Sequence, residues 1–293
     1  MMKRIGFIGL GSMGMPMAQN LMARGFDVRG YDVRAENIEA LGGGQAESAA
    51  KAAAGTDALV LMVVNAAQAE SVLLTDGALE ALPPGGTVIL MATCAPGAVE
   101  ALAAKVEAAG RNFIDAPVSG GVAGARAATL TIMAAAPKET FESARALFDA
   151  LGDKVFHVGE RPGQGATVKT VNQLLCGVHI AAAAEAFALA SKVGVDLNIL
   201  LEIMSGSSAS SWMLKDRGPR MLEADPVVTS AIDIFVKDLG IVLEAGRDMK
   251  AALPLAALAH QLFLATSGRG DGQADDSQVI RAYHSMNGTS PPA

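Results

Sequence analysis

Gly9-Leu10-Gly11-Ser12-Met13-Gly14 follows the short apolar run of residues 5–8 and precedes a segment in which apolar residues have helical spacing. This stretch is typical of a strand–turn–helix unit that binds a dinucleotide. Gly9 would allow the tight turn, Gly11 would let backbone N–H groups approach a pyrophosphate, and Gly14 would let the helix pack closely on the strand. The helix N-terminus would then face the phosphates. A glycine-rich turn in an α/β protein without a dinucleotide is the alternative interpretation.

A carboxylate in register with the glycine loop supports the dinucleotide interpretation. Asp32 comes just after the second predicted strand, residues 28–31, and lies 18 residues beyond Gly14. At this place a carboxylate accepts hydrogen bonds from the adenosine ribose hydroxyls and repels a 2′-phosphate, so that NAD is favoured over NADP. Arg34, two residues further on, would weaken that preference. A turn residue without a ligand is the alternative for Asp32.

The first half of the chain alternates short apolar runs with helical patterns. Further strands are predicted at residues 58–64, 87–91, 112–115, 130–134 and 154–157, with helices at residues 16–23, 97–109 and 138–151. The run at residues 58–64 is apolar throughout, as expected of a strand that is buried on both faces. The alternation of strand and helix predicts a mostly parallel sheet with helices on both of its faces.

The pattern changes near Arg161-Pro162-Gly163 and is helical from there almost to the end of the chain. Helices are predicted over residues 165–193, 196–204, 235–248 and 255–267, with a last helix capped by Asp275 or Asp276. The sequence therefore predicts an α/β Rossmann-type dinucleotide-binding domain over residues 1–162. An all-α domain for substrate binding and subunit contacts would follow over residues 163–293.

The composition of the chain disfavours nucleic acid, membranes and metal ions as binding partners. The chain of 293 residues has a formal net charge of -7, which disfavours binding to nucleic acid and to anionic lipid. Its two cysteines are too few for a disulfide framework, and no pair of its four histidines has metal-ligand spacing, so we expect no metal site. We also expect neither a signal peptide nor a segment with the ~20 apolar residues of a membrane span. The sequence therefore predicts a cytoplasmic protein without nucleic-acid or membrane partners.

Four motifs occur in the order found in one enzyme family. They are the glycine loop, Asp115-Ala116-Pro117-Val118-Ser119-Gly120-Gly121, Gly165-Ala166-Thr167-Val168-Lys169 and Lys237-Asp238-Leu239. With these motifs the chain resembles the β-hydroxyacid dehydrogenase family, which includes 3-hydroxyisobutyrate dehydrogenase and tartronate semialdehyde reductase. The resemblance implies NAD-dependent oxidation of a small hydroxy acid. It also implies a Rossmann domain followed by a helical domain like the C-terminal domain of 6-phosphogluconate dehydrogenase.

Ser119-Gly120-Gly121 follows the predicted strand at residues 112–115. The motif is therefore expected at the carboxyl edge of the sheet, where ligands bind in such folds. A hydroxyl together with exposed backbone N–H groups makes a cradle for a substrate carboxylate, and the resemblance implies the same role. A plain surface turn is the alternative.

Lys169 lies in the first turns of the long predicted helix, and Asn172 and Gln173 follow it on or beside the same helix face. The family's catalytic lysine corresponds to Lys169, which implies that this amine accepts the hydroxyl proton during oxidation and returns it during reduction. A solvated lysine on a helix surface is the alternative. Asn172 and Gln173 are expected to bind substrate. Asparagine is common in the family where this chain has Gln173, whose longer side chain would suit a differently hydroxylated acid.

The resemblance also implies further contacts to the cofactor. They come from three residues after predicted strands and from one in the helical half: Val63, Val64, Thr93 and Lys237. Two positions depart from the family pattern, because Val64 stands where proline is common and Leu90 where aspartate is common. An ion pair with Asp238 or Glu244 is the alternative role for Lys237.

A narrower match links residues 172–186, 211–213 and 233–240 to the branch of the family that oxidises the C2 hydroxyl of L-threonate. Gln173 fits a polyol acid, because a buried amide needs a hydroxyl partner. Trp212, the only tryptophan of the chain, would cover the active-site mouth, pack in the core or contact another subunit.

Two other protein classes share parts of this pattern. A non-catalytic dinucleotide-binding module would have no need of Lys169 and Ser119. An imine reductase usually lacks a lysine at this position and favours NADP, which disagrees with Lys169 and Asp32. The long alanine-rich helix has more apolar surface than one chain can cover, which predicts a homodimer or homotetramer.

Overall fold

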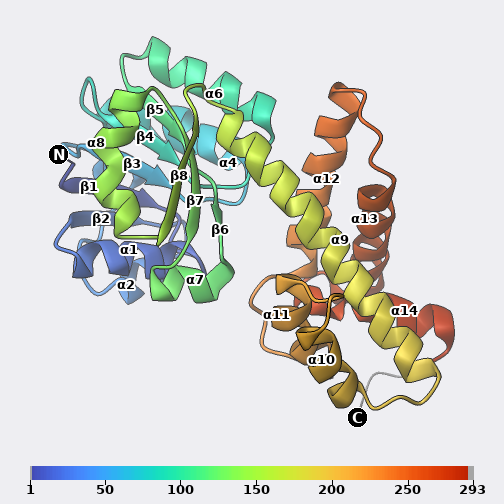
Figure 1. Ribbon diagram of the computed structural model, residues 1–293. Coiled ribbons are helices and arrows are strands. Elements are labelled where there is room, and N and C mark those ends of the chain that lie inside the picture. The colour runs from blue at the N-terminus through green and yellow to red at the C-terminus, as the bar shows by residue number, and fades with distance from the viewer. Residues whose placement is uncertain (1, 290–293) are drawn as a thin grey trace. The chain divides into compact units, whose positions relative to one another are not determined.

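The computed structural model describes residues 2–289. The chain forms two compact units, Met1–Lys169 and Thr170–Ala293 (Figure 1). An α/β unit followed by a helical unit is the order that the sequence predicts. The sequence pattern changes near residue 162. That the part before this residue binds the dinucleotide and the part after it binds substrate and other subunits stays a prediction.

One eight-stranded sheet forms the centre of the first unit. Its strands are β1 (Arg4–Ile8), β2 (Asp27–Tyr31), β3 (Ala58–Leu61), β4 (Thr87–Leu90), β5 (Asn112–Asp115), β6 (Val118–Ser119), β7 (Thr131–Ala135) and β8 (Lys154–Gly159). Their order is β2-β1-β3-β4-β5-β7-β6, with β8 paired to β7. The pairings from β2 to β5 are parallel, as predicted, whereas β7 runs antiparallel to β5 and β6. The predicted strands at residues 130–134 and 154–157 extend the sheet at one side, as expected.

Helices cover both faces of this sheet. They are α1 (Gly14–Ala23), α2 (Ala35–Ala40), α3 (Ala49–Ala53), α4 (Ala66–Glu70), α5 (Ala78–Ala81), α6 (Pro96–Ala108), α7 (Gly121–Ala127) and α8 (Lys138–Asp149), with a π-helical turn at Ser71–Thr75. One core contains Ile89 with Met17 of α1 and Phe148 of α8. The other contains Val88 with Leu102 of α6. Because successive residues of β4 point to opposite faces, Val88 and Ile89 enter different cores, which explains why both residues are apolar.

β3 is shorter than the strand predicted at residues 58–64. It ends at Leu61, and the next three residues form the loop at the carboxyl edge of the sheet. The Val64 N–H donates to Gln68 Oε1 at 2.9 Å, and the Asn65 side chain caps α4 by accepting from the Gln68 N–H. Capping of the following helix thus ends a strand whose apolar sequence continues.

The second unit is built from helices. The first of them, α9 (Gln164–Lys192), begins in the first unit, and most of its length belongs to the second unit. The others are α10 (Leu197–Gly206), α11 (Trp212–Met221), α12 (Ile232–Asp248), α13 (Pro254–Thr266) and α14 (Ile280–Asn287), with a π-helical turn at Ser267–Asp271 and a 3-10 turn at Asp276–Val279. Asp196 caps α10, and Asp275 caps the 3-10 turn before α14, as predicted. In the core of this unit, the rings of Phe235 and Phe263 stack with centroids 5.1 Å apart.

One window of α9 corrects the expectation that no segment has the apolar length of a membrane span. Among the described residues, α9 is the helix long and apolar enough to cross a membrane by length and composition. His179 and Glu185 interrupt its alanine-rich run, but the mean hydropathy of the helix stays high enough for a membrane span. Since 44% of the window is buried inside the structure, and core helices of globular proteins meet the same criterion, composition alone does not assign α9 to a membrane.

Candidate active site

The glycine loop joins β1 to α1 through a backbone that only glycine fits at two positions. Gly9 has a φ of +95°, and a Cβ there would lie 2.3 Å from the Met62 carbonyl oxygen. A Cβ on Gly14 would lie 1.8 Å from the Gly9 carbonyl oxygen, because the first turn of α1 packs directly on the loop. The structure thus contains the tight turn and the close helix–strand packing that a dinucleotide loop requires.

Gly11 differs from these two glycines, because the fold itself leaves room for a side chain there. The nearest atom to a Cβ built on Gly11 is Arg34 Nη2, at 3.7 Å. A side chain would therefore fit in van der Waals contact with Arg34, where it would occupy the path by which a phosphate would approach the N–H groups at the start of α1. The loop of residues 9–14 fits a pyrophosphate, and the contact of Gly11 with it stays a prediction.

Asp32 follows β2 and faces the same loop. Its Oδ2 accepts from the Leu10 N–H at 2.7 Å, and its Oδ1 accepts from the Arg34 N–H at 2.9 Å. The side chain is buried, and Arg34 Nε lies 3.6 Å from Oδ1. Each carboxylate oxygen can accept a further hydrogen bond. Asp32 is therefore held in one orientation beside the glycine loop, as a ribose-binding carboxylate would be.

The loops after β3 and β4 lie at the same edge of the sheet, because they follow the carboxyl ends of strands parallel to β1. Val63 and Val64 follow β3, where Val64 is exposed, and Thr93 follows β4 and is partly buried. Leu90, one of the departures from the family pattern, is fully buried in the core at the end of β4. The structure brings Val63, Val64 and Thr93 to the edge that carries the glycine loop, and their contact with a cofactor stays a prediction.

Ser119 reaches this edge as well. It ends β6, which runs parallel to β5 because both strands are antiparallel to β7. Gly120 and Gly121 follow with φ angles of +131° and +61°, a backbone that favours glycine. The turn thus places main-chain groups without side chains beside the Ser119 hydroxyl, an arrangement suited to a carboxylate.

Asp115, whose role the sequence did not indicate, fixes the start of α9. Its Oδ2 accepts from the Gly163 N–H at 3.0 Å and from the Ala166 N–H at 2.8 Å. Gly165 lies so close that a Cβ on it would be 2.7 Å from the Asp115 carbonyl oxygen. The end of β5 therefore holds the first turn of α9 and with it Lys169. Lys169 is 7% exposed, which contradicts the alternative of a solvated surface lysine.

Burial raises the pKa of the Asp115 carboxyl to about 6, although the backbone hydrogen bonds lower it in part. The folded chain then binds this proton more tightly than the unfolded chain, so the Asp115 contribution to the free energy of unfolding falls as the pH rises from about 4 to about 6. The change amounts to about 3 kcal/mol. We expect Asp115→Asn, whose amide oxygen can still accept both N–H bonds, to be more stable than the parent protein by about this amount above pH 6 and similar to it near pH 4. Urea unfolding of both proteins across this range measures the difference, and a difference that does not change with pH would contradict it.

The second unit contains a polar cluster on α9 and α12. Gln173 is 7% exposed and donates to Asp238 Oδ2, and Lys237 Nζ lies 2.6 Å from Asp238 Oδ1. The ion pair named as the alternative for Lys237 is therefore present, and its contact with a cofactor stays a prediction. Trp212 is 57% exposed at the start of α11, so it does not pack in the core.

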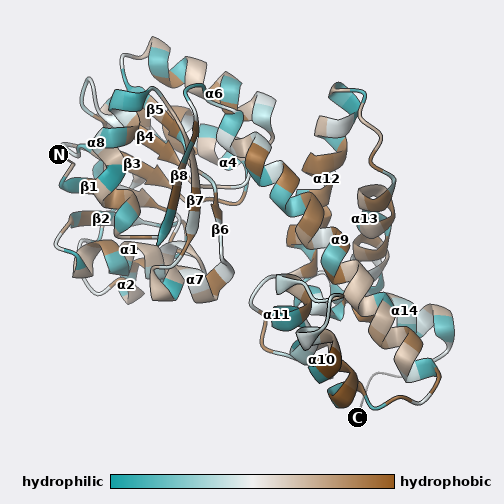
Figure 2. Cartoon of the chain, in the orientation of Figure 1, coloured by the Kyte–Doolittle hydropathy of each residue, from teal (hydrophilic) through white to brown (hydrophobic). Residues whose placement is uncertain are grey.

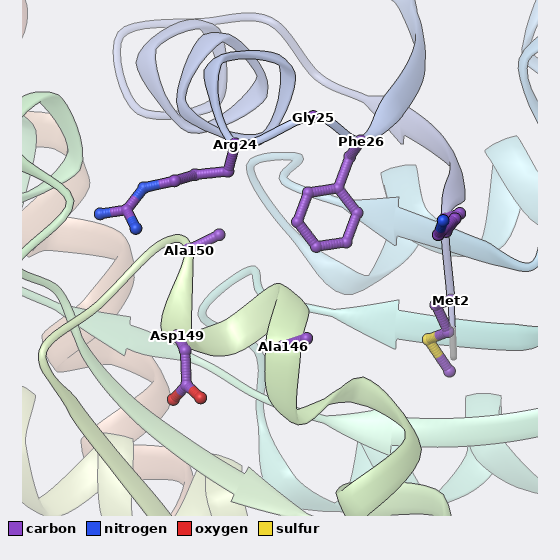
Figure 3. Close-up of a pocket in the computed structure, with 8 residues that line it drawn as sticks. Met2, Arg24, Gly25, Phe26, Ala146, Asp149 and Ala150 are labelled. Atoms are coloured by element: carbon purple, nitrogen blue, oxygen red, sulfur yellow. The ribbon is translucent and has the colours of Figure 1, made fainter.

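An open pocket of about 400 Å³ lies elsewhere in the first unit. It is lined by Met2, Lys3, Arg24, Gly25, Phe26, Ala146, Asp149 and Ala150 (Figure 3). Met2 and Lys3 precede β1 and Phe26 precedes β2, so the pocket lies at the amino edge of the sheet. It is therefore remote from the carboxyl edge and takes no part in the candidate site.

Known proteins match this chain along almost its whole length. Residues 4–159 match the NAD binding domain of 6-phosphogluconate dehydrogenase, and residues 163–283 match the NAD-binding family of NADP-dependent 3-hydroxyisobutyrate dehydrogenase. The chain is 44% identical to L-threonate dehydrogenase from Cupriavidus necator, over 97% of each chain. It is 38% identical to L-threonate dehydrogenase from Escherichia coli K12, over 95% of this chain and 94% of that protein. The crystal structure of 3-hydroxyisobutyrate dehydrogenase from Salmonella typhimurium superposes with a TM-score of 0.90 at 38% identity, over 95% of this chain and 99% of that chain.

Proposed function

Because the chain belongs to the β-hydroxyacid dehydrogenase family, we propose that it oxidises the C2 hydroxyl of L-threonate with NAD as the electron acceptor. The observation that carries this proposal is the buried face of α9, where Lys169 and Gln173 lie one turn apart and are each 7% exposed. An amine and an amide so placed suit an acid that has a second hydroxyl near the one being oxidised. The identity of 38% and 44% to L-threonate dehydrogenases supports the same substrate.

The first unit would hold the cofactor. The backbone of Gly9, Gly11 and Gly14 suits its pyrophosphate, and the Asp32 carboxylate suits its adenosine ribose. Bound NAD⁺ supplies an acceptor for the hydride that leaves the carbinol carbon. The room for a side chain at Gly11 is the structural support for this assignment, since nothing in the fold requires a glycine there.

Lys169 would hold the proton in this reaction. In the direction of oxidation, its neutral amine accepts the proton of the carbinol hydroxyl as the carbonyl forms. In the direction of reduction, the ammonium returns that proton to the oxygen. Asp115 positions the amine, because its carboxylate fixes the first turn of α9.

The remaining polar groups would orient the acid. Ser119 with the main chain of Gly120 and Gly121 would bind the carboxylate, and Asn172 and Gln173 would bind a hydroxyl of the carbon chain. The Gln173 amide already donates to Asp238 and accepts from Asn172, and its second N–H would donate to a hydroxyl of the substrate. Gln173 therefore favours a polyol acid over two alternative substrates. One is 3-hydroxyisobutyrate, which has a methyl group instead of a second hydroxyl, and the other is the smaller tartronate semialdehyde.

The formation of NADH tests the proposed substrate directly. Purified protein is mixed with NAD⁺ and, in separate assays, with L-threonate, D-glycerate or 3-hydroxyisobutyrate, and the absorbance of NADH is followed. We expect the highest kcat/KM with L-threonate. A higher kcat/KM with 3-hydroxyisobutyrate would assign the chain to another branch of the family, and no turnover with any hydroxy acid would contradict the proposed reaction.

Asp32 is expected to set the preference for NAD. Asp32→Ala removes the ribose acceptor and the repulsion of a 2′-phosphate, so the ratio of kcat/KM for NAD to that for NADP should fall about tenfold to a hundredfold. Asp27→Ala, an exposed carboxylate at the opposite end of β2, is the matched control and should leave the ratio unchanged. An unchanged ratio in Asp32→Ala would contradict the ribose contact.

Exposed apolar residues support the proposal that the protein is a homodimer or homotetramer. Val171, Leu175 and Leu189 are exposed on α9, and Ile199 and Ile203 are exposed on α10. Figure 2 shows hydrophobic stretches along both helices. Apolar side chains gathered on neighbouring turns of a helix are typical of a surface that a second subunit covers. Light scattering of the purified protein measures the mass, and a monomer would contradict the proposal.

A further inference from the structure

Four polar side chains of the second unit form one chain of contacts between α9 and α12. Gln173 Nε2 donates to Asp238 Oδ2 at 2.5 Å, and Asn172 Nδ2 donates to Gln173 Oε1 at 2.9 Å. Lys237 Nζ lies 2.6 Å from Asp238 Oδ1, as an ion pair without the geometry of a hydrogen bond. Asp238 is 3% exposed and lies on the otherwise apolar buried stripe of α12. A buried carboxylate among apolar residues is costly unless it is paired, which indicates a specific use.

The charge on Asp238 dictates which way both amides face. An ionised carboxylate only accepts hydrogen bonds, and an ammonium only donates them. The group of Gln173 that meets Asp238 must therefore be its NH₂, and the Gln173 carbonyl oxygen must face the Asn172 NH₂, as observed. If the Gln173 amide turned over, two oxygens would meet at Asp238 and two NH₂ groups would meet at Asn172. Since hydrogen bonds to an ionised group are the stronger ones, the observed orientation is firmly held.

We propose that Asp238 is a positioning residue that keeps an N–H group of Gln173 available to a substrate hydroxyl, and so selects acids with a hydroxyl near the reacting carbon. The Gln173 NH₂ has two N–H groups, and Asp238 accepts from one of them. The other can donate to a hydroxyl oxygen of an acid whose carbinol lies at Lys169, one helical turn away. The inference rests on the proposed function of this face of α9, and it names the residue that gives the face its donor character.

Asp238→Asn tests the proposal with almost no change in shape. Because Lys237 only donates, the new amide turns its oxygen to Lys237 and its NH₂ to Gln173, which reverses the Gln173 amide. The measured quantity is kcat/KM for L-threonate divided by kcat/KM for its deoxy analogues, 2,4-dihydroxybutanoate and 2,3-dihydroxybutanoate. We expect the ratio to one of the analogues to fall severalfold, since the substrate hydroxyl must then turn its own proton to the Gln173 carbonyl instead of accepting from the Gln173 N–H.

A double-mutant cycle separates an effect through Gln173 from an effect through Lys237. In a Gln173→Leu background, Asp238→Asn should cause no further change in the ratio, because the amide through which Asp238 acts is absent. Glu244→Gln, an exposed carboxylate on the same helix, is the matched control and should leave the ratio unchanged. A ratio that stays at the parental value in Asp238→Asn, or that falls equally in both backgrounds, would overturn the proposal.

A measurement on the parent protein keeps the test valid if Asp238→Asn does not fold. In a sample labelled with ¹⁵N-glutamine, the Gln173 side-chain signals are assigned by their loss in Gln173→Leu. An N–H that donates to a buried carboxylate at 2.5 Å should resonate far downfield and exchange slowly with water. Two ordinary, rapidly exchanging amide signals would overturn the proposal.

These outcomes are distinct from a failure of the proposed function. If the parent protein does not oxidise L-threonate but oxidises another hydroxy acid, the same ratio is measured for that acid and its deoxy analogue. If L-threonate is the substrate and Asp238→Asn leaves the ratio unchanged, the proposed function stands and the role of Asp238 does not.

Discussion

Lys169→Ala is expected to lower kcat for hydroxy acid oxidation by about a thousandfold, while the affinity for NAD stays nearly unchanged. The variant lacks the amine that is proposed to accept the carbinol proton, but it keeps the glycine loop and the Asp32 carboxylate that would bind the cofactor. Steady-state kinetics with L-threonate measure the first effect, and quenching of protein fluorescence by NADH measures the second. A fall in kcat together with an intact dissociation constant for NADH places Lys169 in the chemical step rather than in cofactor binding.

Two comparisons make this result specific to the amine. Lys192→Ala removes a lysine from the far end of α9, where its Nζ donates to the Asn287 carbonyl oxygen, and it should keep the parental kcat. Small primary amines added to Lys169→Ala should restore part of the lost rate, because they supply the missing proton acceptor. A Lys169→Ala variant that keeps the parental rate would contradict the proposed mechanism.

The second large effect is expected at Gly14. A Cβ there would lie 1.8 Å from the Gly9 carbonyl oxygen and 3.1 Å from Phe7 Cε1, so the backbone of the loop or of α1 must move. We expect Gly14→Ala to lower the free energy of unfolding by about 3 kcal/mol or more and to abolish NAD binding. Urea unfolding and NADH fluorescence measure the two quantities.

Gly11→Ala is the matched comparison within the same loop. A Cβ at Gly11 has no atom closer than Arg34 Nη2 at 3.7 Å, so the folded chain accommodates it. Its stability should therefore stay within about 0.5 kcal/mol of the parent protein, while NAD binding weakens because the methyl group occupies the path of the phosphate. Normal NAD affinity in Gly11→Ala, or normal stability in Gly14→Ala, would contradict the division of roles between the two glycines.

Turns, helix caps and buried strands could be predicted, because residues close together in the sequence determine them. The turn after β1 needs glycines at fixed offsets, and the capping residues Asp196 and Asp275 precede the segments that they cap. The strand β3 could be recognised within residues 58–64 because burial on both faces makes its sequence continuously apolar. These signals depend on neighbours in the chain, which is why they survive without knowledge of the tertiary structure.

Features that depend on distant partners could not be predicted in the same way. Local sequence does not indicate helix α11, because it contains Pro219 and is stabilised by an ion pair from Arg217 to Asp276, 59 residues away. The two hydrogen bonds from the start of α9 to Asp115 join residues that are 48 and 51 positions apart in the sequence. For Asp238, one signal was available: a carboxylate three residues after Phe235 falls on the buried stripe of an amphipathic helix, where a charge needs a partner.

The proposed function requires the Lys169 amine to lie at the carbinol oxygen of a hydroxy acid. Two crystal structures measure this directly. One is the complex of Lys169→Met with NAD⁺ and L-threonate, in which the substitution stops turnover. The other is the complex of the parent protein with NADH and an unreactive acid. We predict that in the parent complex Lys169 Nζ lies about 3 Å from the oxygen attached to the reacting carbon. An acid bound with that oxygen facing another proton-transfer group, and Lys169 out of reach, would contradict the account.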